Sequence, residues 1–531
     1  MKYSCVQLND LPDEILMIIL KNLTNAEVLY SLLGVNKRLN NIAVDPVFTN
    51  NLSLVMSTWD GLVYSLPDPI LDRFCLHILP KIHQNIEWLH LQSLSMERIL
   101  RATNFPNLYG ISLHNIQAKI ARDLFTEQTS VIHTLKNQLL SFTIDISTKG
   151  TEWYKRDNNA IIFNHILTML ANLQYLNFGR SSICDHRLFF GMRRPTVIST
   201  NLLELHVSLR TFDDCLYLLD GHFNQLRSLY VDVNMILSSD RSVNNTKELP
   251  SLKCFCLHCK WITTVYDELV VPLLHRMSNL EKLDLSITVH ERKTVFDGND
   301  LKMNIINYMP KLNNFTFNIH SLSSFYNKIN LSLNQDIQRT FRVFNDKQII
   351  YWTDYFPKEK KGHCHIYSCP YKLNYYIDIT NNFPGGIFKF VREVSLFDER
   401  PFEHEFFLQI AQSFPFLENL CVRNHERQMY KECSKSINGN QHLSIIKYPY
   451  LKQLDIICTC KDYHEQFLFD TKTCLPLDVR VSMHYERVKQ VTCNFTRIKI
   501  VGDPENFCGE TRELSEHIKS YFPRTQIDCL L

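Results

Sequence analysis

Apolar runs and helix start and stop signals alternate over the first 48 residues, and they predict three short helices. The first is expected at about residues 11–23, with Pro12 in its first turn, where the missing N–H of a proline costs no hydrogen bond. The second opens with the capping-box sequence Thr24-Asn25-Ala26-Glu27 and ends at Gly34. The third begins near Asn36, which is expected to cap it.

The first predicted helix is apolar on every side. Ile, Leu and Met occupy all of positions 15–20, whereas a surface helix needs only one apolar stripe. A unit of about 40 residues buries too little of its own surface to cover such a helix. One side is expected to pack on the second and third helices through Val28, Leu32, Val35 and Leu39. The other side would be covered by the rest of the chain or by an external partner.

The N-terminal stretch resembles an F-box, the adaptor motif of SKP–cullin–F-box ubiquitin ligases. The resemblance covers residues 1–50 and rests on Leu11-Pro12-x-Glu14-Ile15, the apolar run to Leu23, Val28, Leu32, Val35-Asn36-Lys37-Arg38-Leu39 and Asp45-Pro46-Val47-Phe48. It implies binding to a Skp-type adaptor and, through it, to a cullin. The residues expected to bind the adaptor are Leu8, Leu11, Pro12, Ile15, Leu16, Ile19, Leu23, Val28, Leu32, Val35 and Leu39.

After a connector at residues 51–80, an apolar residue followed by others three and five positions later recurs along the chain. Ile86-x-x-Leu89-x-Leu91 is the first such unit and Leu451-x-x-Leu454-x-Ile456 one of the last; a weaker match begins at Val488. Leucine-rich repeats recur at roughly 20–29 residues, and the intervals here fit that period with insertions. The predicted fold class is therefore α/β, an irregular leucine-rich-repeat horseshoe over residues 81–531 with a parallel inner sheet and outer helices. The chain resembles F-box/leucine-rich-repeat proteins.

Residues 320–390 interrupt this rhythm. The aromatic run at 351–356 and the run at 375–379 have the composition of strands, and Pro384-Gly385-Gly386 indicates a turn. Two alternatives remain open for this segment. It forms irregular repeats inside the array, or it projects as an inserted hairpin.

Composition excludes several classes of function. Lys plus Arg is 57 and Asp plus Glu is 55, a net charge of +2 that gives no reason to expect a nucleic-acid or membrane partner. With 14 glycines there is no glycine-rich phosphate loop. No signal peptide or membrane span is recognisable, so the 17 cysteines are expected to be reduced thiols of a cytoplasmic or nuclear protein.

Two Cys/His clusters are candidates for metal sites. His363-Cys364-His365 with Cys369 has zinc-like spacing but no adjacent second pair of ligands, so a Cys/His-containing loop is the preferred interpretation. Cys254, Cys256 and His258 are expected on the concave side of a strand, with little else nearby to complete a site. No metal or other cofactor is predicted. A Cys–His hydrolase is disfavoured because no oxyanion-hole signature accompanies these residues.

The positions two, four and six residues into each unit are expected on the concave face, where they form a mixed polar and aromatic stripe. Such stripes are either solvated faces or protein-binding surfaces anchored by Trp, Tyr and Arg. The residues expected to bind a target protein are Trp88, Tyr175, His206, Tyr230, Asp232, Asp284 and Arg423.

Together these features predict a non-catalytic substrate-recognition subunit of a ubiquitin ligase. The alternative is an interaction scaffold in which the F-box-like helices only cap the apolar end of the repeats. A metal-dependent or thiol enzyme built on the 320–390 segment is the least favoured class.

Overall fold

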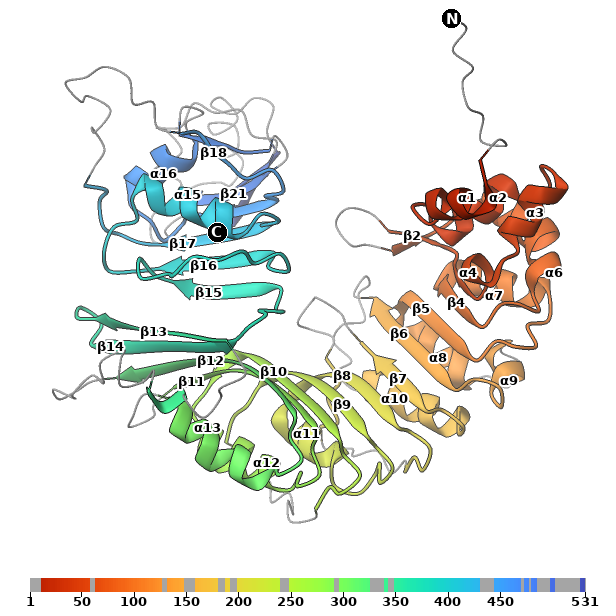
Figure 1. The fold of residues 1–531 in the computed structure, drawn as a ribbon, viewed down its shortest axis with the longest axis horizontal. Helices are drawn as coiled ribbons and strands as arrows, with labels where there is room; N and C mark the ends of the chain where they lie inside the picture. The colour runs from red at the N-terminus through yellow and green to blue at the C-terminus, as the bar shows by residue number, and fades with distance from the viewer. Residues whose placement is uncertain are drawn as a thin grey trace, which may run out of the picture. The chain divides into compact units, whose positions relative to one another are not determined.

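The computed structural model describes the chain except for residues 1–10, 58–62, 127–130, 148–157, 180–186, 192–197, 239–247, 291–295, 325–338, 342–347, 430–443, 469–471, 477–478, 485–496, 502–525 and 531. The chain divides into two compact units (Figure 1). The first comprises residues 1–290 and 298–319, and the second comprises residues 291–297 and 320–531.

The three predicted N-terminal helices are present as α1 (Asp13–Leu20), α2 (Asn25–Leu32) and α3 (Lys37–Ala43), and a short α4 (Pro46–Thr49) follows. Helix α1 is shorter than predicted. Pro12 is its N-cap rather than a first-turn residue, and the Pro12 carbonyl accepts the hydrogen bond from the N–H of Leu16. At the other end of the helix, the N–H of Leu23 already bonds three residues back, to the carbonyl of Leu20.

The first unit contains a large parallel sheet. Each strand from β1 to β11 in the order β1-β4-β5-β6-β7-β8-β9-β10-β11 pairs in parallel with the next, and β12 follows. A small antiparallel hairpin, β2 (Val55–Ser57) and β3 (Val63–Ser65), stands apart from this order. These strands are β1 (Asn51–Ser53), β4 (Trp88–Gln92), β5 (Gly110–Gln117), β6 (Ser141–Ser147), β7 (Tyr175–Phe178), β8 (Glu204–Thr211), β9 (Ser228–Met235), β10 (Cys254–Thr263), β11 (Lys282–His290) and β12 (Asn314–Ser324). The order of the sheet continues from β12 to β14 (Lys361–Ser368) and β13 (Ile349–Phe356).

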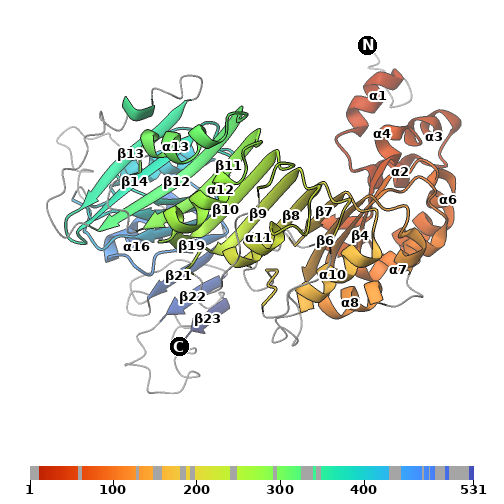
Figure 2. The ribbon, with the colours of Figure 1, turned by 90° about the horizontal axis from the view of Figure 1, so that it is seen from below.

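Within the described residues, helices lie between β1 and β4, β4 and β5, β5 and β6, β6 and β7, β8 and β9, β10 and β11, and β11 and β12, as the sequence pattern predicts. Helices α7, α8 and α11 pack directly on strands, and Figures 1 and 2 show how α8, α10, α11 and α12 follow the sheet. The helices are α5 (Asp68–Arg73), α6 (Leu79–Ile82), α7 (Ser93–Ala102), α8 (Ala118–Thr126), α9 (Val131–Leu135), α10 (Asn158–Met169), α11 (Phe212–Leu218), α12 (Val271–His275) and α13 (Gly298–Asn304). Single turns of π-helix lie at Phe74–Ile78 and Tyr266–Val270, and a single turn of 3-10 helix lies at Ile306–Tyr308.

The strand positions confirm the spacing read from the sequence. Strand β4 begins two residues after Ile86, and the same offset separates Leu226 from β9 and Leu417 from β17. In the units that the structure describes, the side chains three and five residues after the first apolar position are buried, Leu229 and Val231 of β9 among them. Because successive side chains of a strand point to opposite faces, one face forms the core and the other stays open.

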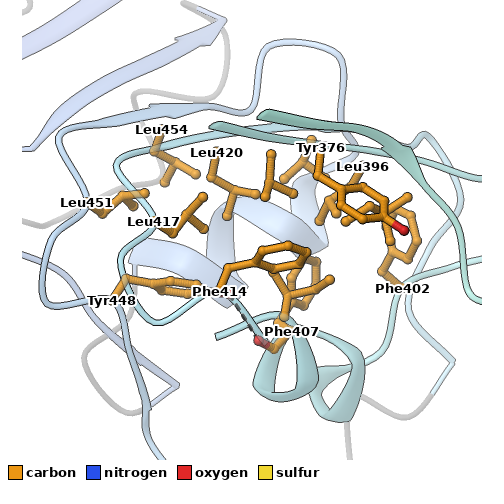
Figure 3. Close-up of a cluster of buried hydrophobic side chains, with 14 of the residues drawn as sticks. Tyr376, Leu396, Phe402, Phe407, Phe414, Leu417, Leu420, Tyr448, Leu451 and Leu454 are labelled. Atoms are coloured by element: carbon orange, nitrogen blue, oxygen red, sulfur yellow. Dashed lines mark hydrogen bonds between the residues drawn. The ribbon is translucent and has the colours of Figure 1, made fainter. Parts of the chain in front are cut away.

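The second unit has its own parallel sheet of seven strands, β15-β16-β17-β19-β21-β22-β23. Its core, shown in Figure 3, packs Leu417, Leu420, Leu451 and Leu454 from beneath the strands against Phe407 of helix α15. The elements are β13 (Ile349–Phe356), β14 (Lys361–Ser368), β15 (Tyr375–Ile379), β16 (Glu393–Phe397), α15 (His404–Ser413), β17 (Asn419–Arg423), β18 (Ile446–Lys447), β19 (Gln453–Asp455), α16 (Lys461–Leu468), β20 (Thr473–Cys474), β21 (Arg480–His484), β22 (Arg497–Val501) and β23 (Gln526–Leu530).

The interrupting segment contains both predicted strands and one that was not predicted. Strand β13 covers the 351–356 run and pairs antiparallel with β14, while β15 covers 375–379 and joins the seven-stranded sheet. Trp352 and Tyr367 of the β13–β14 hairpin belong to the buried core of the second unit, so the hairpin is packed and does not project. The weak match at Val488 lies outside the described residues.

The hairpin buries three histidines. His363 and His365 of β14 lie beside His320 of β12; Nδ1 of His320 is 3.1 Å from Nε2 of His363, and the His320 and His365 rings stack at 3.6 Å. All three are at most 3% exposed. The His363-Cys364-His365 sequence therefore lies on a buried strand of the hairpin and not in the expected loop. Burial lowers the pKa of all three imidazoles, although the carboxylates of Asp378 and Asp354 partly oppose this at His363.

These shifts predict acid sensitivity of the fold. A histidine in the unfolded chain has a pKa of about 6.5, so below that pH the unfolded chain binds protons that the buried imidazoles of the folded chain do not bind. The contribution of these histidines to the free energy of unfolding is fully present above this pH and should be lost as the pH decreases. Burial raises the pKa of Asp354, which acts in the opposite direction. His365→Phe should flatten the dependence of the melting temperature on pH, whereas the exposed His425→Asn should leave it unchanged; equal slopes for both variants would contradict the prediction.

Candidate functional site

Helix α1 presents an apolar face to solvent. Leu16 and Leu20 point inward and are 0% and 4% exposed. Ile15, Ile18 and Ile19 lie on the other side and are 43%, 62% and 42% exposed. Nothing in the described part of the chain covers this side, which fits the expectation that something outside the three helices is needed to cover it.

Local capping holds the face in position. The N–H of Glu27 donates to the Thr24 hydroxyl at 3.2 Å, and the Thr24 N–H donates to the Glu27 carboxylate at 2.8 Å, which is the predicted capping box. The Thr24 N–H and the Thr24 hydroxyl both donate to the Glu27 carboxylate, and these two bonds hold the pKa of Glu27 below its usual value. Gly34 has a φ of +95°, a conformation that favours glycine, and ends the α2 segment as predicted.

Arg38 of α3 fixes the start of α1. Its Nε donates to Asp13 at 2.7 Å, and its guanidinium also donates to the carbonyl of Leu11. One side chain thus holds the two residues that flank Pro12. The third helix therefore determines the direction in which α1 begins.

The structure separates the predicted adaptor-binding residues into two groups. Pro12, Ile15, Ile19, Leu23 and Val35 are exposed, and Leu11 is half-buried. Leu16, Val28, Leu32 and Leu39 are buried in the unit's own core, where they support the exposed face from beneath and are not part of it. Leu8 lies outside the described residues.

Two findings differ from the sequence interpretation of these helices. Val35 was expected to pack inward, but it is 60% exposed because the chain has already left α2 at Gly34. Ile18 and Val47 are exposed and were not among the predicted contact residues. For Ile18 the signal was present, since it belongs to the apolar run of the first helix.

Comparison with known proteins agrees with this geometry. A family model described as the F-box domain matches residues 8–51. The chain carries an F-box domain. A search of curated proteins finds no match to the chain. F-box domains generally bind Skp-type adaptors, and the exposed apolar face of α1 lies within the matched residues.

The open face of the first unit's sheet brings most predicted target-binding residues together. One row across the sheet pairs His206 of β8 with Tyr230 of β9, Tyr230 with Cys256 of β10 and Cys256 with Asp284 of β11. The His206 and Tyr230 rings stack at 4.0 Å, and Tyr175 lies 5.4 Å from His206. These residues form a continuous polar and aromatic surface.

Trp88 lies at the β4 end of the same face. Its indole N–H donates to the Ser112 hydroxyl at 2.9 Å, and its ring contacts Tyr175 edge-on at 6.4 Å. The ring lies over Gly110, where an added Cβ would be 2.2 Å from it. Gly110 therefore makes the space that this tryptophan occupies.

The charges on the face are largely paired with each other. Glu204 lies 2.6 Å from His206, His258 lies 3.5 Å from Asp284, and Asp232 is held by Arg187 at 3.0 Å. Burial opposes ionisation of Asp284, but the hydrogen bond and charge of His258 hold its pKa below the usual range. Arg187 was not predicted, because it precedes β8 outside any repeat position.

Arg423 is not part of this surface. It lies on β17 in the second unit, where it forms an ion pair with Asp378. Its position within its own unit is equivalent to that of the other predicted residues, on the open side of a strand. The structure places it with Asp378 and Phe397.

The Cys254 and Cys256 side chains are more buried than expected. Both are less than 9% exposed, and the Cys254 thiol lies 3.5 Å from the Tyr230 hydroxyl. A hydrogen bond from Cys256 lowers the pKa of Cys254 to about 6. Among the residues that the structure describes, no group of three or more His, Cys, Asp or Glu side chains could hold a metal ion. No helix in the described ranges is long and apolar enough to span a membrane.

Loss of the capping box should loosen the F-box. Thr24→Ala removes the side-chain acceptor for the Glu27 N–H, and loss of such a cap costs about 1 kcal/mol of stability. Ser31→Ala, at an exposed position of the same helix, should not destabilise the protein. Hydrogen exchange of α2 amides in both variants measures the difference; equal protection would show that the cap is not needed.

Proposed function

We propose that this protein is a substrate-recognition subunit of an SKP–cullin–F-box ubiquitin ligase. The observation that carries the proposal is the exposed apolar face of α1 inside a matched F-box domain. Covering Ile15, Ile18 and Ile19 with a Skp-type adaptor would remove a solvated apolar patch, and burying one such side chain fully contributes about 1.5–3 kcal/mol. A cullin would then be recruited through the adaptor.

The rest of the chain would hold the target protein. The constant offset between the first apolar residue of a described unit and the start of its strand supports the interpretation as leucine-rich repeats. In such arrays evenly spaced side chains on one face of the sheet form a broad binding surface. The face from Trp88 to Asp284 has Trp, Tyr and His rings in contact, and Trp and Tyr are residue types that anchor protein interfaces.

The proposed role is non-catalytic. The protein would bring a target close to ubiquitin-loaded machinery, so that proximity supplies the rate enhancement. A cytoplasmic or nuclear location with reduced thiols belongs to the same proposal.

The alternative, an F-box that only caps the sheet, has one observation in its favour. Asn25 of α2 donates to the Asn51 carbonyl of β1 at 2.7 Å, and the N–H groups of Glu87 and Trp88 donate to the Asn50 carbonyl. The F-box therefore does cover the first strand. Capping alone does not require an exposed apolar face on α1, so adaptor binding distinguishes the two functions.

The adaptor-binding face gives a direct test. Ile15→Asp with Ile19→Asp places two charges on the exposed side of α1 without altering the buried Leu16 and Leu20, and it should abolish binding to a purified Skp-type adaptor. The matched control is Leu94→Asp, which adds a charge at an exposed leucine of α7 and should bind normally. Wild-type protein that does not bind the adaptor would favour the capping function.

The target-binding face gives a second test. Tyr230→Ala with Asp232→Ala should reduce target affinity by at least about 2 kcal/mol, as truncation of interface hot spots does. The control pair, Glu268→Ala with Lys302→Ala, removes exposed charges elsewhere in the first unit. Quantitative cross-linking of bound proteins from cells compares the variants. Loss of target binding in the control pair, but not in the Tyr230 and Asp232 pair, would reject this face as the target-binding surface. Adaptor binding should be unchanged in both double variants.

A further inference from the structure

The same tight turn precedes strands in both units. The N–H of the residue two positions before the strand donates to a carbonyl three residues earlier, as from Leu280 to Met277 at 3.0 Å in the first unit. In the second unit Leu417 donates to Phe414 at 3.2 Å and Leu451 to Tyr448 at 3.3 Å. Figure 3 shows Phe414 and Tyr448 within the buried cluster. The first and last residues of each turn thus anchor it in the core.

In the first unit the third residue of the turn has a structural task. It is repeatedly an asparagine whose side-chain N–H₂ donates to a carbonyl of the preceding turn. The bonds run from Asn107 to Gln84 at 2.7 Å, from Asn172 to Asn137 at 3.1 Å, from Asn201 to Ala171 at 2.9 Å and from Asn279 to Pro250 at 3.1 Å. These asparagines form a ladder that links neighbouring turns.

In the second unit the same turn position carries aromatic side chains. Phe390, Phe416 and Tyr450 precede β16, β17 and β19, and they are 59%, 38% and 53% exposed. We call them the aromatic strip. The Phe416 and Tyr450 rings lie 5.5 Å apart. Aromatic rings at this position cannot make the amide bonds of the ladder, and they expose apolar area at a turn where a polar side chain fits.

The charges around the aromatic strip are mainly positive. Within the four turns at residues 370–374, 388–392, 414–418 and 448–452, the cations are Lys372, Lys389, Arg392 and Lys452, and the single carboxylate is Glu418. Glu418 is already paired, with Lys452 at 2.7 Å and Arg392 at 3.7 Å. Arg392 also lies 5.1 Å over the Phe416 ring. Lys372 occupies, before β15, the position that the aromatic residues occupy before the next strands.

We propose that the aromatic strip is a second protein-interaction surface and that it binds an acidic segment of a partner protein. Carboxylates of the segment pair with the surrounding cations, and its apolar side chains pack on the exposed rings. Its residues differ from those of the F-box and of the open face of the first unit. The proposal does not depend on adaptor binding, because it concerns direct binding by the chain alone.

The test uses a short fluorescent peptide of alternating Glu and Phe residues, titrated into the full-length protein at low salt. Phe416→Asn with Tyr450→Asn should weaken binding at least about tenfold, which corresponds to about 1.4 kcal/mol. Asparagine is the residue that the equivalent turns of the first unit use, so the melting temperature should not fall. Trp261→Asn, which removes a 61% exposed aromatic ring of the first unit, is the matched control and should bind like the wild type.

Three results would overturn the proposal. The first is wild-type protein that fails to bind the peptide or binds an otherwise identical peptide with Lys in place of Glu equally well. The second is unchanged affinity in the Phe416 and Tyr450 double variant. The third is a wild-type dimer that this variant converts to a monomer, because the strip would then bind a second copy of the chain.

Discussion

Alternation of buried and exposed side chains along parallel strands is the constraint on which the structure depends. Strands β6, β8 and β9, for example, each contribute three apolar side chains to the core and leave most of the intervening ones on the open face. Parallel pairing in register then lines up equivalent residues of neighbouring strands, as with His206, Tyr230 and Asp284. The surface proposed for target binding is therefore a direct result of how the core is filled.

The F-box is joined to this sheet by hydrogen bonds and not merely by chain connectivity. Strand β1 follows α4 directly, pairs with β4 and accepts a bond from Asn25 of α2. Within the first unit the exposed face of α1 is therefore held in a fixed relation to the start of the sheet. A rigid link of this kind would suit the proposed role, in which a bound target is presented in a defined direction.

Much of this arrangement could be predicted from the sequence because the signals are local. The Thr24 and Asn36 caps, Gly34 and the apolar spacing each depend on residues close together in the chain, and the structure confirms them. Strands whose stabilising partners are distant were missed. Strand β14 has no repeat pattern, and its histidines are buried by contacts with β12 and with Trp352. The Arg187–Asp232 pair likewise joins residues 45 positions apart.

The packing of Trp88 on Gly110 has a consequence for sequence comparison. Gly110 needs no positive φ, so its backbone would accept other residues, and only the indole on the neighbouring strand excludes them. Positions 88 and 110 should therefore co-vary among relatives. A side chain at 110 should occur only where 88 is small, and a chain with glycine at 110 but no large ring at 88 should have a shallow depression at that end of the open face.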